Sequence, residues 1–223
     1  MNQINPMQQE IQQSVLKSNT SLVGLVCKDG VVLGADRRVT AGSLLMNKDY
    51  VKIMKVTDYL AVCYTGGVAD AQLTHKIIAA ELRLKELKTK TRPTVKEAAH
   101  LLALMIYRNI RTPTMLPNIV GTLIAGFDED GKTYLYSIEP AGGVYEVKDY
   151  DANFSSGMPY ILGLLERTYK KDISVKDGIE LTKECIKSST QRDVGSGNGI
   201  DVFSITKDGI KHIVSEEIVA EYK

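Results

Sequence analysis

The sequence lacks the features that mark several large classes of protein. Lys and Arg number 28 against 27 Asp and Glu, a formal net charge of +1, so no bulk positive charge is present to attract nucleic acid. No apolar run approaches the roughly 18 residues that span a bilayer. Residues 1–19 are polar and lack the basic and apolar regions of a secretory signal. These absences favour a cytoplasmic protein that binds neither nucleic acid nor membrane.

Residues that commonly bind metals or act as nucleophiles are scarce. Cys27, Cys63 and Cys185 are an odd number, lie far apart, and have no metal-ligand spacing, so we interpret them as buried small apolar residues. The three histidines fall within helical or strand patterns. Neither a Gly-x-Ser-x-Gly elbow nor a P-loop occurs, which argues against a Ser–His–Asp hydrolase and a nucleotide-binding enzyme. We therefore expect no metal and no organic cofactor.

Turn signals divide the chain into short apolar runs after a polar first segment. Asp-Gly pairs at 29–30, 130–131 and 208–209 each separate two runs of strand length. Because Asp and Gly tolerate the positive φ of tight turns, each pair predicts a β-hairpin. A further hairpin is expected around residues 57–58, between runs at 50–56 and 60–65. Repeated hairpins indicate antiparallel sheets.

Helical patterns occur in two pairs between the strands. The first helix is indicated by an apolar stripe at helical spacing, formed by Leu73, Ile77, Ala80, Leu84 and Leu87. The second begins at a capping box, Thr94 to Glu97, after Pro93. Two later helices are expected at 159–168 and 175–189. Helices grouped in pairs argue against a doubly wound parallel sheet and predict an α+β fold, in which two antiparallel sheets lie face to face with helix pairs outside.

Thr20 stands where the first ordered strand begins. A threonine at a newly exposed N-terminus is a recognised nucleophile, because its own amine accepts the hydroxyl proton. Such an enzyme needs a leader that blocks the threonine, a cation near the hydroxyl, and a carboxylate that holds the cation. Asp36 and Lys52, at neighbouring strand ends, are the candidates. On spacing alone, a surface threonine, a strand-end aspartate and a solvated lysine explain these residues as well.

Several motifs together resemble one known family. The segments TSLVG from Thr20 and KDGVVLGADRR at 28–38 look like the start of mature proteasome β subunits. GGVADAQ at 66–72 is similar to the glycine turn that enters the first helix of those proteins, and Ser156-Gly157 and QRDVGSG at 191–197 match two further motifs. The resemblance covers residue 20 to about residue 214 and is of the archaeal type. It implies a four-layer αββα N-terminal-nucleophile (Ntn) hydrolase sandwich, with residues 1–19 as a propeptide and 20–223 as one domain.

The resemblance also implies roles for individual residues. Thr20 would be the nucleophile and, once freed, its amine the proton acceptor; Lys52 would lie beside the hydroxyl, held by Asp36. The backbone N–H of Gly66 would stabilise the oxyanion. Three polar residues would surround the terminal amine: Ser156, Asp193 and Ser196. An apolar specificity pocket, favouring cleavage after hydrophobic residues, would be lined by Val39, Tyr50, Met54, Tyr64 and Val68.

One position departs from the family pattern. Active members usually carry Gly immediately before the catalytic threonine, and here the residue is Asn19. Self-cleavage needs a kinked backbone that Gly adopts at least cost, although Asn is among the better non-glycine residues at positive φ. We therefore expect slow or partner-dependent maturation at the Asn19–Thr20 bond.

Two functions remain open at this point. The chain is either a proteolytic subunit, hydrolysing unfolded proteins through Thr20 after autocatalytic removal of residues 1–19, or a structural subunit that never exposes its nucleophile. The implied partners are α subunits and other β subunits in stacked seven-membered rings, with an unfolding ATPase acting through the α ring. A bacterial-type threonine protease subunit or a small-molecule Ntn amidohydrolase is a more distant alternative.

Overall fold

The structure is a computed structural model that describes residues 19–114 and 118–218. The expected propeptide therefore lies outside the described residues, apart from its last residue, Asn19. Within the described ranges, no helix is long and apolar enough to cross a membrane.

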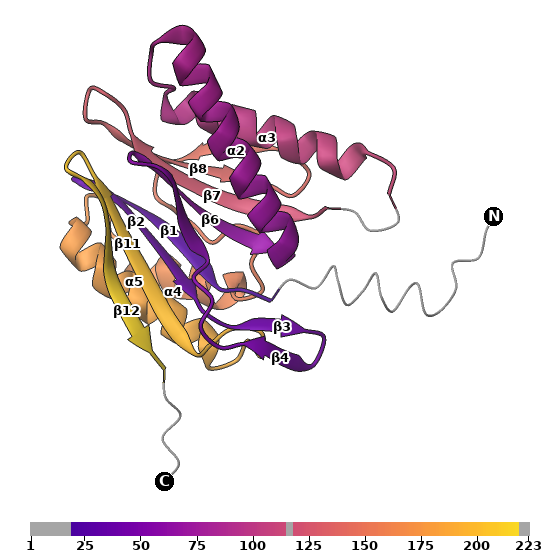
Figure 1. Ribbon diagram of the computed structural model, residues 1–223. Helices are drawn as coiled ribbons and strands as arrows, with labels where there is room; N and C mark the ends of the chain where they lie inside the picture. The colour runs from indigo at the N-terminus through magenta and orange to yellow at the C-terminus, as the bar shows by residue number, and fades with distance from the viewer. Residues whose placement is uncertain (1–18, 115–117, 219–223) are drawn as a thin grey trace.

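Two five-stranded antiparallel sheets form the centre of the molecule (Figure 1). The first sheet has, in spatial order, β10 (Tyr150–Asp151), β1 (Leu22–Cys27), β2 (Gly30–Asp36), β11 (Gly199–Thr206) and β12 (Gly209–Glu217). The second has β5 (Ile53–Thr57), β6 (Leu60–Gly66), β7 (Val120–Phe127), β8 (Thr133–Ile138) and β9 (Val144–Val147). A separate hairpin pairs β3 (Val39–Ala41) with β4 (Leu44–Asn47).

Helices cover the outer face of each sheet. Helices α2 (Val68–Thr89) and α3 (Val95–Arg111) lie on the second sheet, and α4 (Met158–Thr168) and α5 (Val175–Thr190) lie on the first (Figure 1). Buried apolar side chains form one cluster between the two sheets and one beneath each helix pair. Because each sheet is covered on both faces, its central strands are apolar on both sides. The predicted αββα layering is confirmed.

The Asp-Gly signals correctly located three hairpins. They connect β1 to β2, β7 to β8, and β11 to β12, and each pair is antiparallel. The fourth predicted hairpin, β5–β6, also forms, but β5 begins at Ile53 instead of residue 50. Tyr50 is drawn away from the sheet because its N–H donates to the carbonyl of Arg37 at 3.1 Å. The β3–β4 hairpin was not predicted.

All four predicted helices are present, with the expected caps on two of them. Thr94 and Glu97 form the capping box of α3, and the Ser174 side chain accepts from Asp177 N–H at the start of α5. The apolar stripe of α2, however, does not face the core. Leu73, Ile77, Leu84 and Leu87 are 40–53% exposed, whereas the buried residues of α2 are Ala71, Thr74, Ile78 and Leu82. In the single chain, α2 therefore presents an apolar outer face.

Candidate active site

The start of β1 and the end of β2 lie side by side at one end of the first sheet. Leu22 pairs with Ala35, and Asp36 N–H donates to the carbonyl of Ser21 at 3.0 Å. Thr20, one residue further out, is thereby placed next to Asp36. The two-residue register of an antiparallel hairpin joined by a short turn fixes this proximity.

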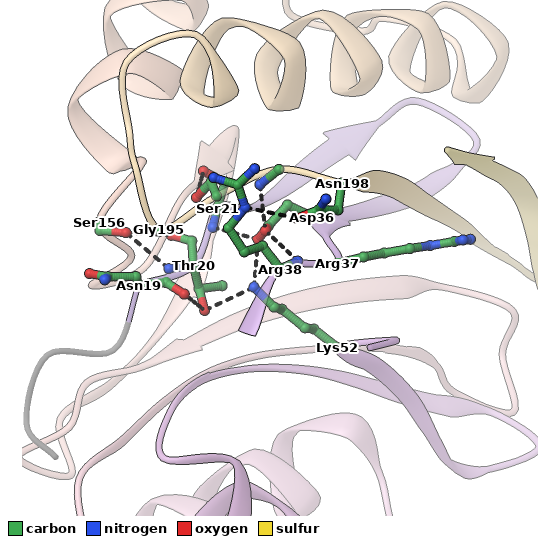
Figure 2. A network of polar contacts seen from close by, with 12 residues as sticks. Asn19, Thr20, Ser21, Asp36, Arg37, Arg38, Lys52, Ser156, Gly195 and Asn198 are labelled. Carbon is green, nitrogen blue, oxygen red and sulfur yellow. Dashed lines mark hydrogen bonds and ion pairs between the residues drawn. The ribbon is translucent and has the colours of Figure 1, made fainter. Parts of the chain in front are cut away.

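Lys52 approaches the same point from the second sheet. It immediately precedes β5, and its carbonyl accepts from Tyr64 N–H on β6 at 3.4 Å. Its Nζ lies 3.2 Å from Thr20 Oγ1 and 2.6 Å from Asp36 Oδ1 (Figure 2). The side chain of Lys52 is 5% exposed and that of Asp36 is fully buried. The structure thus brings together all three residues that the sequence singled out, in the space between the sheets.

Asp36 is a fixed anchor for this arrangement. Its Oδ1 accepts from Ser21 N–H and Lys52 Nζ, at 2.9 and 2.6 Å. Its Oδ2 accepts from Arg38 N–H and Gly197 N–H, both at 2.9 Å. A carboxylate has about four lone-pair directions, and all are used here. The carboxylate therefore cannot rotate, and it holds Lys52 Nζ at the Thr20 hydroxyl.

A second polar cluster surrounds the backbone nitrogen of Thr20. The N–H of Thr20 donates to Ser156 Oγ at 2.9 Å, and Ser156 Oγ donates to Asp193 Oδ2 at 2.6 Å. Ser196 Oγ donates to the same carboxylate oxygen at 2.5 Å. Ser21, which the sequence did not single out, adds a 2.7 Å hydrogen bond from its hydroxyl to Ser196 Oγ. The three expected partners of the terminal nitrogen are therefore connected in one network.

The Thr20 hydroxyl is directed at the peptide bond that precedes it. Its Oγ1 donates to the carbonyl oxygen of Asn19 at 2.8 Å (Figure 2). Thr20 itself is buried, with 4% of its surface exposed. The nucleophile of the expected self-cleavage and the carbonyl group that it would attack are thus in contact, with a buried cation beside them.

Gly66 ends β6, two residues beyond the backbone contact with Lys52. Its φ is +112°, and a Cβ at this position would lie 2.2 Å from the carbonyl oxygen of Ile119 on the approach to β7. Only glycine fits both conditions. Its role towards an oxyanion remains a prediction.

Arg37 is a site-supporting residue that the sequence reasoning missed. Its guanidinium forms a bidentate pair with Asp201 on β11, at 2.9 and 2.6 Å, and contacts Asp49 at 2.9 Å. The hydrogen bonds to Asp201 raise the pKa of Arg37. Arg37 thereby ties the end of β2 to β11 and to the segment that leads to Lys52. The available signal was an acidic residue, Asp201, inside an otherwise apolar strand.

Comparison with known proteins decides the family. The family model described as "Proteasome subunit" matches residues 16–205. The chain belongs to the proteasome subunit family. A "Proteasome subunit beta" of Archaeoglobus profundus is 41% identical over 209 residues, which are 94% of each chain.

Two further relatives with the same description extend this result. The one from Ferroglobus placidus is 40% identical over 94% of this chain and 97% of its own. The one from Nanoarchaeum equitans is 39% identical over 88% of this chain and 98% of its own. Proteasome β subunits as a group are peptidases of multi-subunit core particles that also contain α subunits.

The pocket residues that the proteasome family pattern implies lie on four elements around Lys52. Met54 and Tyr64 sit on β5 and β6 and pack against the cluster beneath α2 and α3, and Tyr64 is 4% exposed. Burial raises the pKa of the Tyr64 phenol, so this group stays neutral. Val39 is on β3, Val68 begins α2, and the Tyr50 hydroxyl accepts from Gln72 at 3.4 Å. Their contact with substrate remains a prediction.

Proposed function

We propose that the chain is a threonine-type endopeptidase: a proteolytic β subunit whose Thr20 is exposed by autocatalytic removal of residues 1–19. One observation carries the proposal. Lys52 Nζ, held by the buried Asp36, lies 3.2 Å from Thr20 Oγ1. A buried cation next to a hydroxyl favours the oxyanion form, and this lowers the cost of using a weak nucleophile.

Self-cleavage would begin from the contact already present. Thr20 Oγ attacks the carbonyl carbon of Asn19, an Oγ–C bond forms, the C–N bond to Thr20 breaks, and the hydroxyl proton ends on the Thr20 nitrogen. Water then hydrolyses the resulting ester. The products are a leader that ends in the Asn19 carboxylate and a domain of residues 20–223 with a free amine.

Substrate hydrolysis would repeat this chemistry on a bound polypeptide. The free amine, with an ordinary pKa of about 7.7–8.0, accepts the Thr20 hydroxyl proton. Ser156 and Asp193 hold this nitrogen, with Ser196 bonded to the same carboxylate. The N–H of Gly66 would stabilise the oxyanion, and water would release the acyl group from Thr20. No metal or organic cofactor is required by these steps.

The apolar pocket would select hydrophobic residues before the cleaved bond. Met54 supplies an apolar side chain, and the bulky Tyr64 shortens the available depth. Val39, Tyr50 and Val68 would complete the lining. Unfolded polypeptides in the cytoplasm are the substrate class that such a site would take.

Exposed apolar surfaces support assembly with other subunits. The outer face of α2 and the β3–β4 hairpin, where Leu44 and Met46 are 62% and 60% exposed, are unusually apolar for a free surface. We propose that they contact α subunits and neighbouring β subunits in stacked heptameric rings. An unfolding ATPase would deliver substrates through the α ring.

A structural β subunit is the second candidate, because Asn19 stands where active relatives usually have Gly. The test is the intact mass and N-terminal sequence of the chain after assembly with its α partner, for the wild type and Thr20→Ala. We expect the wild type to begin at Thr20 and the variant to retain residues 1–19. A finished wild-type particle that still begins at Met1 would support the structural subunit instead.

A further inference from the structure

The side chain of Asn19 occupies a defined place beside the nucleophile. Its Nδ2 donates to Thr40 Oγ1 on β3 at 3.2 Å. On the other side it lies against Gly195, in the loop that also carries Asp193 and Ser196 (Figure 2). The residue before the cleaved bond is therefore held from two separate segments of the chain.

Gly195 leaves room for this side chain and for little else. A Cβ at Gly195 would lie 1.8 Å from Asn19 Cβ, 2.4 Å from its Cγ and 2.9 Å from its Cα, and these are the three nearest atoms. The φ of Gly195 is not in the left-handed range, so its backbone alone does not demand glycine. Asn19 is what excludes a larger residue.

The loop that contacts Asn19 is itself fixed to the active site. Gly195 N–H donates to Asp193 Oδ1 at 3.1 Å, and the other oxygen of Asp193 binds Ser156, which holds the Thr20 nitrogen. Any shift of Asn19 against Gly195 therefore changes the position of the Asn19 carbonyl relative to Thr20 Oγ1.

We propose that Thr40 and Gly195 form a cradle for the Asn19 side chain, which positions the Asn19 carbonyl for attack by Thr20. The cradle supplies by side-chain contacts the positioning that glycine-ended leaders reach by backbone freedom. Thr40 and Gly195 are thus positioning residues for leader removal. This inference rests on the proposed self-cleavage, although the cradle contact itself is measurable without it.

The cleavage arm of the test uses the full chain assembled with its α partner and follows leader removal by intact mass. Gly195→Ala should slow removal by about tenfold or more, because overpacking displaces Asn19. Adding Asn19→Gly should bring the rate to within about twofold of Asn19→Gly alone, since the clash is then gone. Thr40→Val should slow removal about two- to tenfold, the effect of one hydrogen bond, and Thr40→Ser should restore it.

The matched control is Gly163→Ala in α4, where a Cβ meets nothing within 4 Å. It should leave the rate unchanged. If Gly195→Ala slows removal equally with Asn19 and with Gly at that position, the cradle is refuted.

The second arm removes catalysis by Thr20→Ala and measures hydrogen exchange at the amide of residue 20, which Ser156 holds in the intact chain. With Asn19 present, Gly195→Ala should accelerate this exchange by about tenfold or more, and with Asn19→Gly it should have little effect. Equal exchange in all four chains would overturn the proposal. If the coupling is present but chains that retain Thr20 never lose the leader, the cradle stands and the proposed self-cleavage fails.

Discussion

Replacing Asp36 by Asn tests the central anchor of the site. Asp36 accepts four hydrogen bonds, two on each oxygen, and donates none. An asparagine has one acceptor oxygen and one NH₂ group. In one orientation the NH₂ faces Ser21 N–H and Lys52, and in the other it faces the N–H groups of Arg38 and Gly197. Either way, two accepted hydrogen bonds are lost and two donors point at a donor.

The magnitude follows from these contacts. A hydrogen bond to a charged group contributes about 1.5–3 kcal/mol, so two of them predict a loss of about 3–6 kcal/mol in the free energy of unfolding. That is a large part of the roughly 5–15 kcal/mol of a typical domain. Leader removal should also slow by about 10²-fold or more, because Lys52 loses its acceptor or its position.

The assay is urea unfolding followed by circular dichroism, in a Thr20→Ala background so that all chains keep the same length. Asp49→Asn is the matched control, since the Asp49 carboxylate contacts Arg37 but is 78% exposed, and an exposed pair contributes about 0–1 kcal/mol. A loss of less than about 1 kcal/mol for Asp36→Asn would show that the buried carboxylate does not anchor the site.

Three further predictions concern the rest of the fold. Leu123→Ala, in the fully buried layer between the sheets, should lower the free energy of unfolding by about 2–5 kcal/mol, and Leu44→Ala on the exposed hairpin by less than about 0.5 kcal/mol; equal losses in urea unfolding would contradict this packing. Burial raises the pKa of Cys27 and Cys185 to about 12, so at pH 8 iodoacetamide should modify them only after unfolding, and rapid adducts on the native chain by intact mass would be inconsistent with their burial. Burial lowers the pKa of His75, so the unfolded state binds more protons below about pH 6.5 and stability falls there; His75→Gln should flatten unfolding midpoints between pH 7 and 5, and an unchanged slope would exclude His75 as the cause.

Local turn chemistry made most of the sheet topology predictable. Asp-Gly pairs specify a tight turn within a few residues, so three hairpins could be located without tertiary information. The β3–β4 hairpin escaped prediction because Leu44, Leu45 and Met46 are consecutive and exposed, and so show no alternation of buried and exposed side chains. Its apolar character concerns contacts that a single sequence pattern does not specify.

The stripe on α2 shows the same limit for helices. Periodicity identified the helix and its apolar face correctly, but a periodic pattern does not say what covers that face. In the single chain the sheet instead receives Ala71, Thr74, Ile78 and Leu82. These smaller or β-branched residues let the helix lie close to the sheet.

The site was predictable where the family pattern reached and not beyond it. Thr20, Asp36 and Lys52 were brought together as expected, since hairpin register places their strand ends side by side. Arg37 and Asp201 are 164 residues apart in sequence, and only the pairing of β2 with β11 brings them into contact. The contact of Asn19 with Gly195 likewise depends on a loop conformation that no local pattern specifies.

The four donors to Asp36 also set when this site can exist during synthesis. They come from residues 21, 38, 52 and 197, and the last of these lies just before β11. A nascent chain on the ribosome can pair β1 with β2 early, but the Asp36 carboxylate stays incompletely bonded until residue 197 has emerged and β11 has paired with β2. An interrupted translation product therefore carries the threonine, the aspartate and the lysine without an assembled nucleophile, so an unfinished chain poses no proteolytic hazard to its neighbours.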